Sequence, residues 1–206
     1  MTNCKEMAYS VIKEKIVTCE LMPGALVDQA ALMAEIGVSR TPVREAIHAL
    51  AQEGLLVIMP RRAVVVSSIN SAEVGHIYTV RLEFEPFIAR LATEFVTEAE
   101  LQVFRKTFSA PQEDFKTLIR NDFLLHRYLA EKTGNPYLIR LMENVLSQNL
   151  RIVALGAKIP DRMADSNKEH IEIIDRMLAR DAEGAEAAMR THMDSAKRVA
   201  AIVHRF

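Results

Sequence analysis

The sequence predicts a mainly α-helical protein, in which an N-terminal winged helix-turn-helix precedes an all-α bundle of six helices. Three helical segments and two strand-like runs fill residues 1–69. In residues 70–206, apolar residues recur with helical spacing and show no strand-like alternation. Breaker residues divide this second part into six segments. We therefore expect a winged helix-turn-helix domain at 1–69 and a separate helical domain at 70–206.

Composition sets broad limits on the protein class. The chain has 206 residues, half of them hydrophobic, which suffices for one large domain or two small ones. No stretch approaches the roughly 18 apolar residues of a membrane-spanning helix, and the N-terminus lacks a signal-peptide core. Cys4 and Cys19 are the only cysteines, which excludes a disulfide framework. These features predict a cytoplasmic protein without a membrane partner.

Residues 5–52 predict three helices joined by short turns. The first covers about 5–20 and ends at Pro23-Gly24. Asp28 is a good N-cap for a short second helix, which Gly37 terminates. The third begins after Ser39 and runs to about Gln52. A helix, a short turn containing glycine and a second helix form the helix-turn-helix arrangement.

The start of the third helix, Ser39–Ala46, carries two arginines on a face that is separate from its apolar stripe. Ser39 can cap the helix through its side chain, and Pro42 lies early enough to be tolerated. Arg40 and Arg44 stand near the helix N-terminus, where the dipole favours anions instead. We therefore expect them to serve an outside partner, and free N–H groups beside arginines suit the edge of a DNA major groove.

Two strand-like runs at 55–59 and 63–67 predict a β-hairpin wing. Arg61 and Arg62 form its basic tip, which is either a second DNA contact or an ordinary solvated turn. Residues 1–69 contain seven basic and seven acidic residues, so net charge gives no support for DNA binding. The hypothesis depends on where the cations cluster.

The run Gly37-Val-Ser-Arg-Thr-Pro-Val-Arg-Glu-Ala-Ile, followed by Glu53-Gly-Leu, resembles the signature of GntR-family transcriptional regulators. The resemblance implies that the helix start contacts operator phosphates and bases, and that the wing tip enters the minor groove. The residues concerned are Ser39, Arg40, Thr41, Arg44, Arg61 and Arg62.

Two positions depart from the family pattern. Many relatives carry an arginine where this chain has Ala30, and a wing-tip glycine where it has Ala63. The first departure removes one expected DNA contact, and the second restricts the backbone at the tip. Both departures bear on which operator sequence the protein recognises more than on the family assignment.

The second domain is expected to contain helices at 71–95, 98–108, 112–133, 136–156, 160–180 and 182–204. In the first of these, Phe84 and Phe95 belong to the predicted inward stripe, with Arg81 among its members. Pro86 is expected to kink this helix.

Four polar residues fall on apolar stripes of three other helices: Asp122, His126, His170 and His192. A buried polar group without a partner costs about 1–3 kcal/mol, so these residues should meet one another. One carboxylate and three imidazoles can hold zinc, nickel, manganese or iron, and the sequence does not choose among these metals. The alternative for each histidine is an ordinary hydrogen bond in the core.

Several short motifs resemble the FCD ligand-binding domain of the FadR branch. They are Asn121-Asp-Phe-Leu-Leu-His126, Gly134-Asn-Pro-Tyr-Leu, Glu169-His170-Ile and Thr191-His192-Met. Six helices match the VanR-like subgroup. The resemblance implies a metal ion held by Asp122, His126, His170 and His192.

The resemblance also implies a small organic-acid effector. The guanidinium of Arg81 is a candidate to bind the effector carboxylate, whereas the alternative is an ion pair with Glu83, Glu85 or another carboxylate. Asn149, on an inward stripe of the adjoining helix, is a weaker effector candidate.

These observations predict a ligand-responsive regulator that binds palindromic operator DNA as a homodimer. Effector binding would shift the arrangement of the DNA-binding domains, and repression is the commoner mode in the family. Two alternatives remain: a metal-dependent enzyme that uses the Asp/His site, and a regulator whose helical domain is a metal-free dimerisation module.

Overall fold

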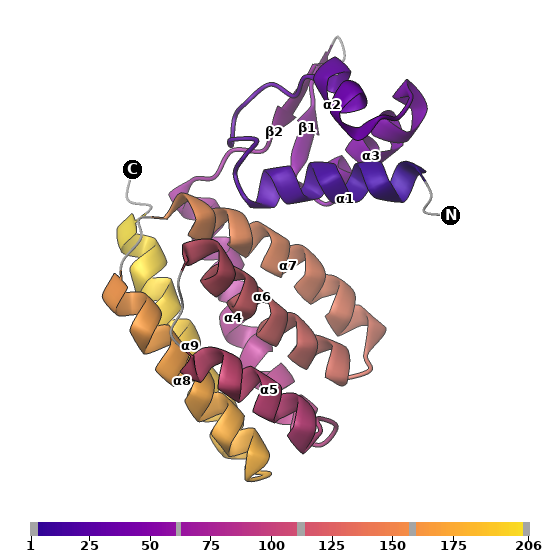
Figure 1. Ribbon diagram of the computed structural model, residues 1–206. Helices are drawn as coiled ribbons and strands as arrows, with labels where there is room; N and C mark the ends of the chain where they lie inside the picture. Colours follow the sequence, from indigo (N-terminus) through magenta and orange to yellow (C-terminus); the bar gives the residue numbers. More distant parts are fainter. Residues whose placement is uncertain (1–3, 61–62, 111–113, 157–159, 204–206) are drawn as a thin grey trace. The chain divides into compact units, whose positions relative to one another are not determined.

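The computed structural model describes residues 4–60, 63–110, 114–156 and 160–203, except for the side chains of 160–163 and 203 (Figure 1). The chain forms two compact units, Met1–Ile69 and Asn70–Phe206. Each unit has a hydrophobic core of its own. No described helix is long and apolar enough to cross a membrane.

The N-terminal unit is a three-helix winged domain. Its two strands pair antiparallel, with Leu56 opposite Val66, and Leu26 adds an isolated bridge to Val65. The predicted three helices and hairpin are confirmed. The elements are α1 (Cys4–Val17), α2 (Gln29–Ile36), α3 (Arg40–Gln52), β1 (Leu56–Ile58) and β2 (Val64–Val66).

Local capping explains how α2 and α3 are separated. The Asp28 side chain accepts hydrogen bonds from the backbone N–H groups of Ala30 and Ala31. Gly37 ends α2 in the left-handed conformation with φ 73°, which a glycine adopts without strain. Ser39 occupies the N-cap position of α3 but makes no side-chain cap bond, so that part of the prediction is wrong. Its hydroxyl remains on the exposed surface.

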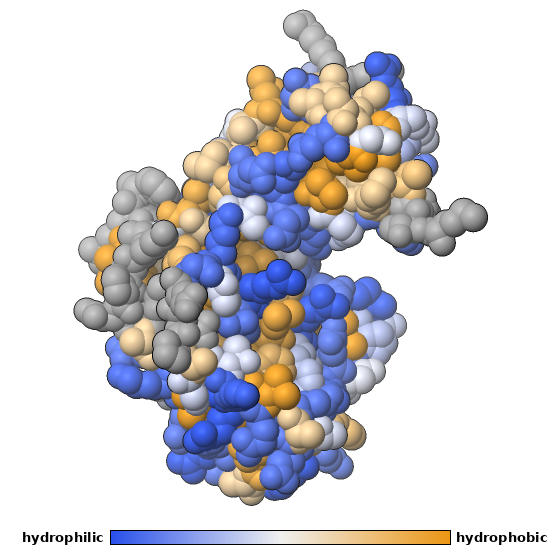
Figure 2. All heavy atoms as spheres, in the orientation of Figure 1, coloured by the Kyte–Doolittle hydropathy of each residue, from blue (hydrophilic) through white to orange (hydrophobic). Residues whose placement is uncertain are grey.

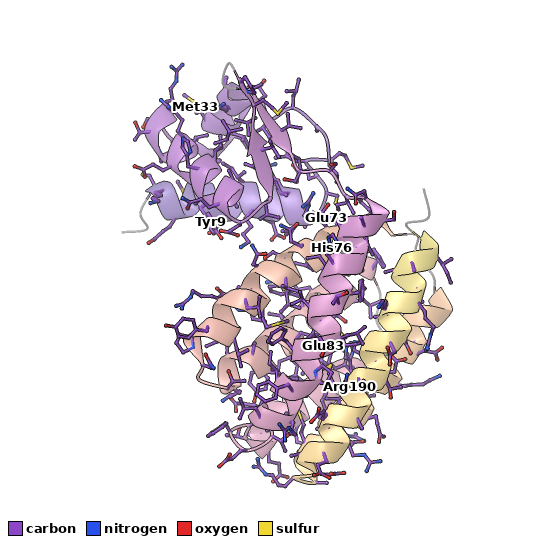
Figure 3. The ribbon with its side chains drawn as sticks, turned by 180° about the vertical axis from the view of Figure 1, so that it is seen from behind. Tyr9, Met33, Glu73, His76, Glu83 and Arg190 are labelled. Carbon is purple, nitrogen blue, oxygen red and sulfur yellow. The ribbon has the colours of Figure 1, made fainter. Side chains whose placement is uncertain are left out.

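The second unit contains six helices within its described residues, in agreement with the predicted number. Helices α4 and α9 pack side by side, and α8 packs against α9 and α5 (Figures 1 and 3). Helix α6 packs mainly against α7. The helices are α4 (Ser71–Ala92), α5 (Glu98–Ser109), α6 (Phe115–Lys132), α7 (Pro136–Leu155), α8 (Pro160–Leu178) and α9 (Ala182–Val203).

Several helix starts in this unit follow from side-chain caps. Thr97 and Glu100 form a reciprocal capping box at the start of α5. Asn135 accepts hydrogen bonds at the start of α7, where Pro136 takes the first position. These caps fix the turn that precedes α5 and the turn between α6 and α7.

The inward face of α4 differs from the one predicted. Phe84 is 37% exposed and Phe95 is 50% exposed, so neither belongs to the core. Arg81 and Glu85 are buried instead, because they pair with each other one turn apart. The helix continues through Pro86, whose ring is buried.

The apolar core of the second unit draws on all six helices, including Ile88, Leu101, Leu129, Met142 and Met189. On the face drawn in Figure 2, hydrophilic residues cover much of this unit, and apolar residues form smaller patches among them. The core surrounds the inward-facing sides of α4, α6, α8 and α9, so polar groups that point inward from these helices lie in an apolar setting.

Candidate metal centre and DNA-binding surface

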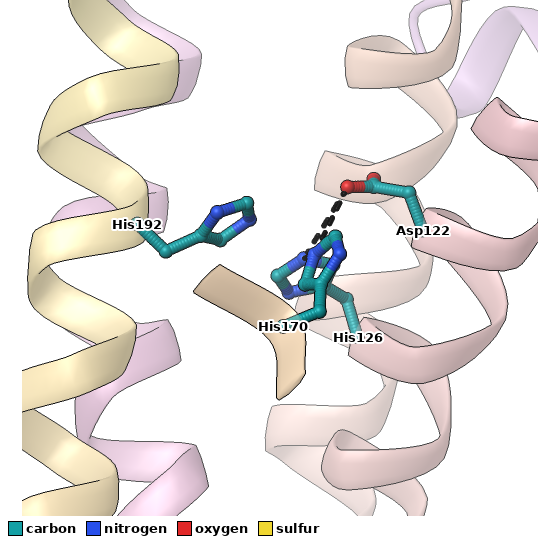
Figure 4. A group of neighbouring side chains, drawn as sticks. All are labelled: Asp122, His126, His170 and His192. Carbon is teal, nitrogen blue, oxygen red and sulfur yellow. Dashed lines mark hydrogen bonds and ion pairs between the residues drawn. The ribbon is translucent and has the colours of Figure 1, made fainter. Parts of the chain in front are cut away.

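Four side chains of types that can ligate a metal ion, from three helices, meet in the second unit (Figure 4). Asp122 and His126 lie one turn apart on α6, and His170 and His192 come from α8 and α9. One ligand atom of each residue lies within 4.8 Å of a ligand atom of every other. The structure therefore brings together the four residues that the sequence singled out.

The separations between the ligand atoms of Asp122, His126 and His170 are close to those around a metal ion. His170 Nε2 lies 3.3 Å from Asp122 Oδ1 and 3.4 Å from His126 Nε2. His126 Nε2 lies 3.7 Å from the same Asp122 oxygen. A tetrahedral ion with bonds of about 2.0–2.1 Å keeps its ligands about 3.3–3.4 Å apart. A nitrogen-rich set with one carboxylate suits a divalent first-row metal.

The three histidines are almost fully buried, with exposures of 1–2%, whereas the Asp122 side chain is 26% exposed. Phe108 packs against the His170 ring at 4.5 Å between ring centres. Electrostatic interactions are strong in such a setting, because little water screens them. Asp122 forms the solvent-facing side of the cluster.

Glu85 is a buried carboxylate whose place beside this cluster the sequence reasoning missed. It forms ion pairs with Arg81 on its own helix and with Nδ1 of His126 on α6. Glu85 and Arg81 are each only 2% exposed. The pairing of Arg81 with Glu85, left open from the sequence, is therefore present. The spacing of four residues between Arg81 and Glu85 was the sequence signal for this ion pair.

A second carboxylate that the sequence reasoning missed contacts His192. Oε2 of Glu169 on α8 lies 2.7 Å from Nδ1 of His192 on α9. The Glu169 side chain is 21% exposed and lines a surface groove between α8 and α9, with a volume of about 550 Å³. Its position directly before His170 gave no indication that it would reach a different histidine.

The charges around His126 shift the pKa values in the cluster. Burial disfavours the charged form of His126, but Glu85 and Asp122 outweigh it and raise the pKa to about 9. Burial likewise acts against Glu85, yet Arg81 and His126 lower its pKa to about 2. Burial lowers the pKa of His170. The carboxylates therefore favour a positive charge among the imidazoles, which either a proton or a metal ion can supply.

Two further buried polar atoms in the same unit lack a hydrogen-bond partner among the described residues. Nη2 of Arg81 is buried and has no hydrogen-bond partner among the described residues. Oδ1 of Asn149 on α7 is in the same situation, and this side chain is 3% exposed. Buried polar groups are nearly always satisfied, so these two atoms are candidates for contact with a ligand.

In the N-terminal unit, the predicted DNA contacts on α3 are all exposed. Neither Arg40 nor Arg44 forms an ion pair with any described residue. Ser39 and Thr41 lie beside them at the start of the helix. Ala30 is exposed on α2, where its methyl group offers DNA no hydrogen bond. Arg61 and Arg62, predicted for the wing tip, lie outside the described residues.

Comparison with protein families assigns both units. Residues 4–66 match the model for bacterial regulatory proteins of the gntR family, and residues 76–195 match the FCD domain. The chain belongs to the GntR family and carries an FCD domain. The GntR chain is thus a transcriptional regulator and not an enzyme.

Similar proteins agree with this assignment. The HTH-type transcriptional repressor NanR of Salmonella arizonae is 29% identical over 98% of this GntR chain and 84% of its own length. The structure of E. coli McbR/YncC superposes with a TM-score of 0.87 at 23% identity, covering 97% of this chain and 98% of that one. A GntR regulator from Rhodococcus sp. RHA1 has a TM-score of 0.83 at 19% identity, covering 98% and 99%. At these identities the solved structures support the fold alone.

Proposed function

We propose that this GntR chain is a cytoplasmic repressor that binds a palindromic operator as a homodimer. Its FCD domain would bind a divalent metal ion and a small carboxylate effector. The observation that supports this sensing role best is the convergence of one carboxylate and three imidazoles within 4.8 Å. The metal is zinc, nickel, manganese or iron.

The DNA-binding part of the proposal uses the exposed start of α3. Arg40 and Arg44 would contact phosphates and base edges, while Ser39 and Thr41 would contact phosphates. Since helix-turn-helix dimers read two half-sites, two copies of this chain would bind a palindrome. Arg61 and Arg62 would add minor-groove contacts from the wing.

Charged groups around the FCD site support the binding of a divalent ion. Arg81, Glu85, Glu169 and Asp122 together carry a net charge of −2 if the histidines are neutral, and a divalent ion would neutralise it. A bound metal has the chemistry to accept a carboxylate oxygen at an open coordination position. Nη2 of Arg81 and the Asn149 amide would hold the effector by hydrogen bonds.

Repression is proposed because the similar Salmonella proteins are named as NanR repressors. Effector binding would favour one arrangement of the DNA-binding domains over another and so release the operator. The size of the response is limited by the difference in effector affinity between the two arrangements.

A mobility shift on DNA from the chain's own promoter region tests the DNA-binding part. We expect retardation by wild type, and much weaker retardation by the Arg40→Ala/Arg44→Ala variant. Equal retardation by both proteins, or none by wild type at low salt, would contradict this part of the proposal.

Metal analysis of full-length protein purified without chelator tests the sensing part. We expect about one ion per chain in wild type and in His76→Ala, a control at an exposed histidine of α4. His126→Ala and His192→Ala should lose the ion. Equal metal content in all four proteins would contradict the assigned ligands.

A metal-free FCD domain is the competing function, and one observation favours it. Glu85 and Asp122 lie on either side of His126, so a proton on this ring could satisfy both carboxylates. In that case the cluster is a hydrogen-bonded core and the domain serves dimerisation alone. Wild type that contains no metal, and whose melting temperature is unaffected by added Zn²⁺ or Ni²⁺, would support this alternative.

A further inference from the structure

Two of the four proposed metal ligands have a carboxylate on the nitrogen that faces away from the centre. Nδ1 of His126 pairs with Glu85, and Nδ1 of His192 lies 2.7 Å from Glu169. Nε2 of His126 instead lies near Asp122 and His170 (Figure 4). The two carboxylates come from α4 and α8, so neither shares a helix with the histidine that it contacts.

A carboxylate on Nδ1 determines which nitrogen can bind a metal. A neutral imidazole carries one N–H donor and one lone pair. Since an ionised carboxylate only accepts hydrogen bonds, it favours the tautomer with the proton on Nδ1 and the lone pair on Nε2. It also fixes the rotation of the ring and raises the basicity of the ligand nitrogen.

We propose that Glu85 and Glu169 are positioning residues that orient His126 and His192 so that Nε2 of each ring binds the ion. This inference rests on the proposed metal centre. Glu85 is itself held in place, because its other oxygen pairs with Arg81. The chain from Arg81 through Glu85 to His126 is buried throughout.

The two positioning carboxylates differ in exposure, and this sets an expected order of effects. The Glu85 side chain is 3% exposed, whereas that of Glu169 is 21% exposed and lines a surface groove. Water can partly replace the hydrogen bond of Glu169, but it cannot easily reach Nδ1 of His126. Losing Glu85 should therefore weaken the site more than losing Glu169.

His170 gives an internal comparison. Its Nδ1 is buried and, unlike Nδ1 of His126 and of His192, has no carboxylate within ion-pair distance among the described residues. Its Nε2 lies 3.3 Å from Asp122 Oδ1. Packing against Phe108, rather than a carboxylate, holds this ring. Positioning by acidic residues is therefore specific to the other two histidines.

Competition between full-length protein and a chromophoric chelator for Zn²⁺ tests the inference. We expect Zn²⁺ affinity to fall by about 100-fold in Glu85→Gln and about 10-fold in Glu169→Gln, the range seen for such outer partners. The controls Glu83→Gln and Glu172→Gln change exposed carboxylates on the same two helices and should stay within about twofold of wild type. Far-UV circular dichroism checks folding, and Glu169→Gln carries the test alone if Glu85→Gln fails to fold.

Loading the proteins with ¹¹³Cd²⁺ adds a readout that a general loss of stability would not move. An Nε2-bound ion couples to both carbon-bound ring protons, whereas an Nδ1-bound ion couples strongly to one. We expect the two-proton pattern for His126 and His192 in wild type, and its loss or weakening at His192 alone in Glu169→Gln.

If wild type and both glutamine variants bind Zn²⁺ with equal affinity, the positioning role is overturned but the metal centre is not. Nδ1 coordination at His126 or His192 in wild type would also overturn it. Wild type that binds no metal would overturn the centre and the positioning role together.

Discussion

Replacement of Arg40 or Arg44 by alanine should separate DNA affinity from protein stability. Both side chains are exposed and make no ion pair with a described residue, so each substitution should change the unfolding free energy by less than about 0.5 kcal/mol. A homodimer on two half-sites loses two arginines per substitution. If each contacts one phosphate, the slope of log affinity against log salt should become shallower by about 1.8.

If an arginine instead binds a base edge, each lost contact should cost about 1–3 kcal/mol. Two half-sites then lose about 2–6 kcal/mol, and affinity falls by at least about 30-fold, mainly for the specific operator. Fluorescence anisotropy with labelled operator and with unrelated DNA, over a range of salt concentrations, distinguishes the two cases. Arg120→Ala, an exposed arginine on α6, is the charge-matched control. Affinities and salt slopes equal to this control would refute the assignment of α3 as the DNA-contacting helix.

Three further predictions test other parts of the account. Zn²⁺ at 100 times its dissociation constant should stabilise the folded wild type by about 2.7 kcal/mol, and should leave the stability of His192→Ala unchanged. Thermal melting measures both effects, and equal shifts in melting temperature would contradict the ligand assignment. Lys132 and Thr97 lower the pKa of Glu100 to about 2, so its charge favours the folded state above about pH 4.5 and this advantage is lost as the pH falls toward 2. Urea unfolding of wild type and Glu100→Gln should therefore differ most above pH 5 and converge near pH 2, and a constant difference would contradict the argument. Gly37→Ala should destabilise the protein by about 1 kcal/mol, because φ at this residue is 73°. Gly75→Ala, within α4, should instead stabilise the protein by about 0.5–1 kcal/mol. Urea midpoints of the two variants that move in the same direction would be inconsistent with this reasoning.

Local signals in the sequence were sufficient for most of the fold. Asp28 and Gly37 mark the ends of α2 because capping and left-handed geometry depend on a few neighbouring residues. The same holds for Thr97 at α5 and Asn135 at α7. Ser39 shows the limit of this reasoning, since its type and position suit a cap, yet its hydroxyl makes no cap hydrogen bond.

The inward face of α4 could not be read from hydrophobicity alone. Phe84 and Phe95 have the spacing of core residues, but the interior is polar where Glu85 meets Arg81 and His126. The attraction within a buried ion pair offsets the free-energy cost of desolvation only when both partners are in place. One of the two partners of Glu85, His126, comes from α6. Helical periodicity within α4 carries no information about that partner.

The candidate metal ligands were recognisable because all four are polar residues on apolar stripes. The outer carboxylates were not, since Glu85 and Glu169 become relevant only when α4 packs near α6 and α8 near α9. Such contacts join residues 41 and 23 positions apart in the chain, and no local pattern encodes them. Sequence reasoning thus reached the ligand set but not the residues that position it.

The most direct test of the central claim is anomalous scattering, at the absorption edge of the bound metal, from crystals of protein purified without chelator. We predict one peak per chain, about 2.0–2.2 Å from Nε2 of His126, His170 and His192 and from an oxygen of Asp122. Crystals that show no anomalous peak among these side chains, with the three rings hydrogen-bonded to one another and to the carboxylates, would contradict the account.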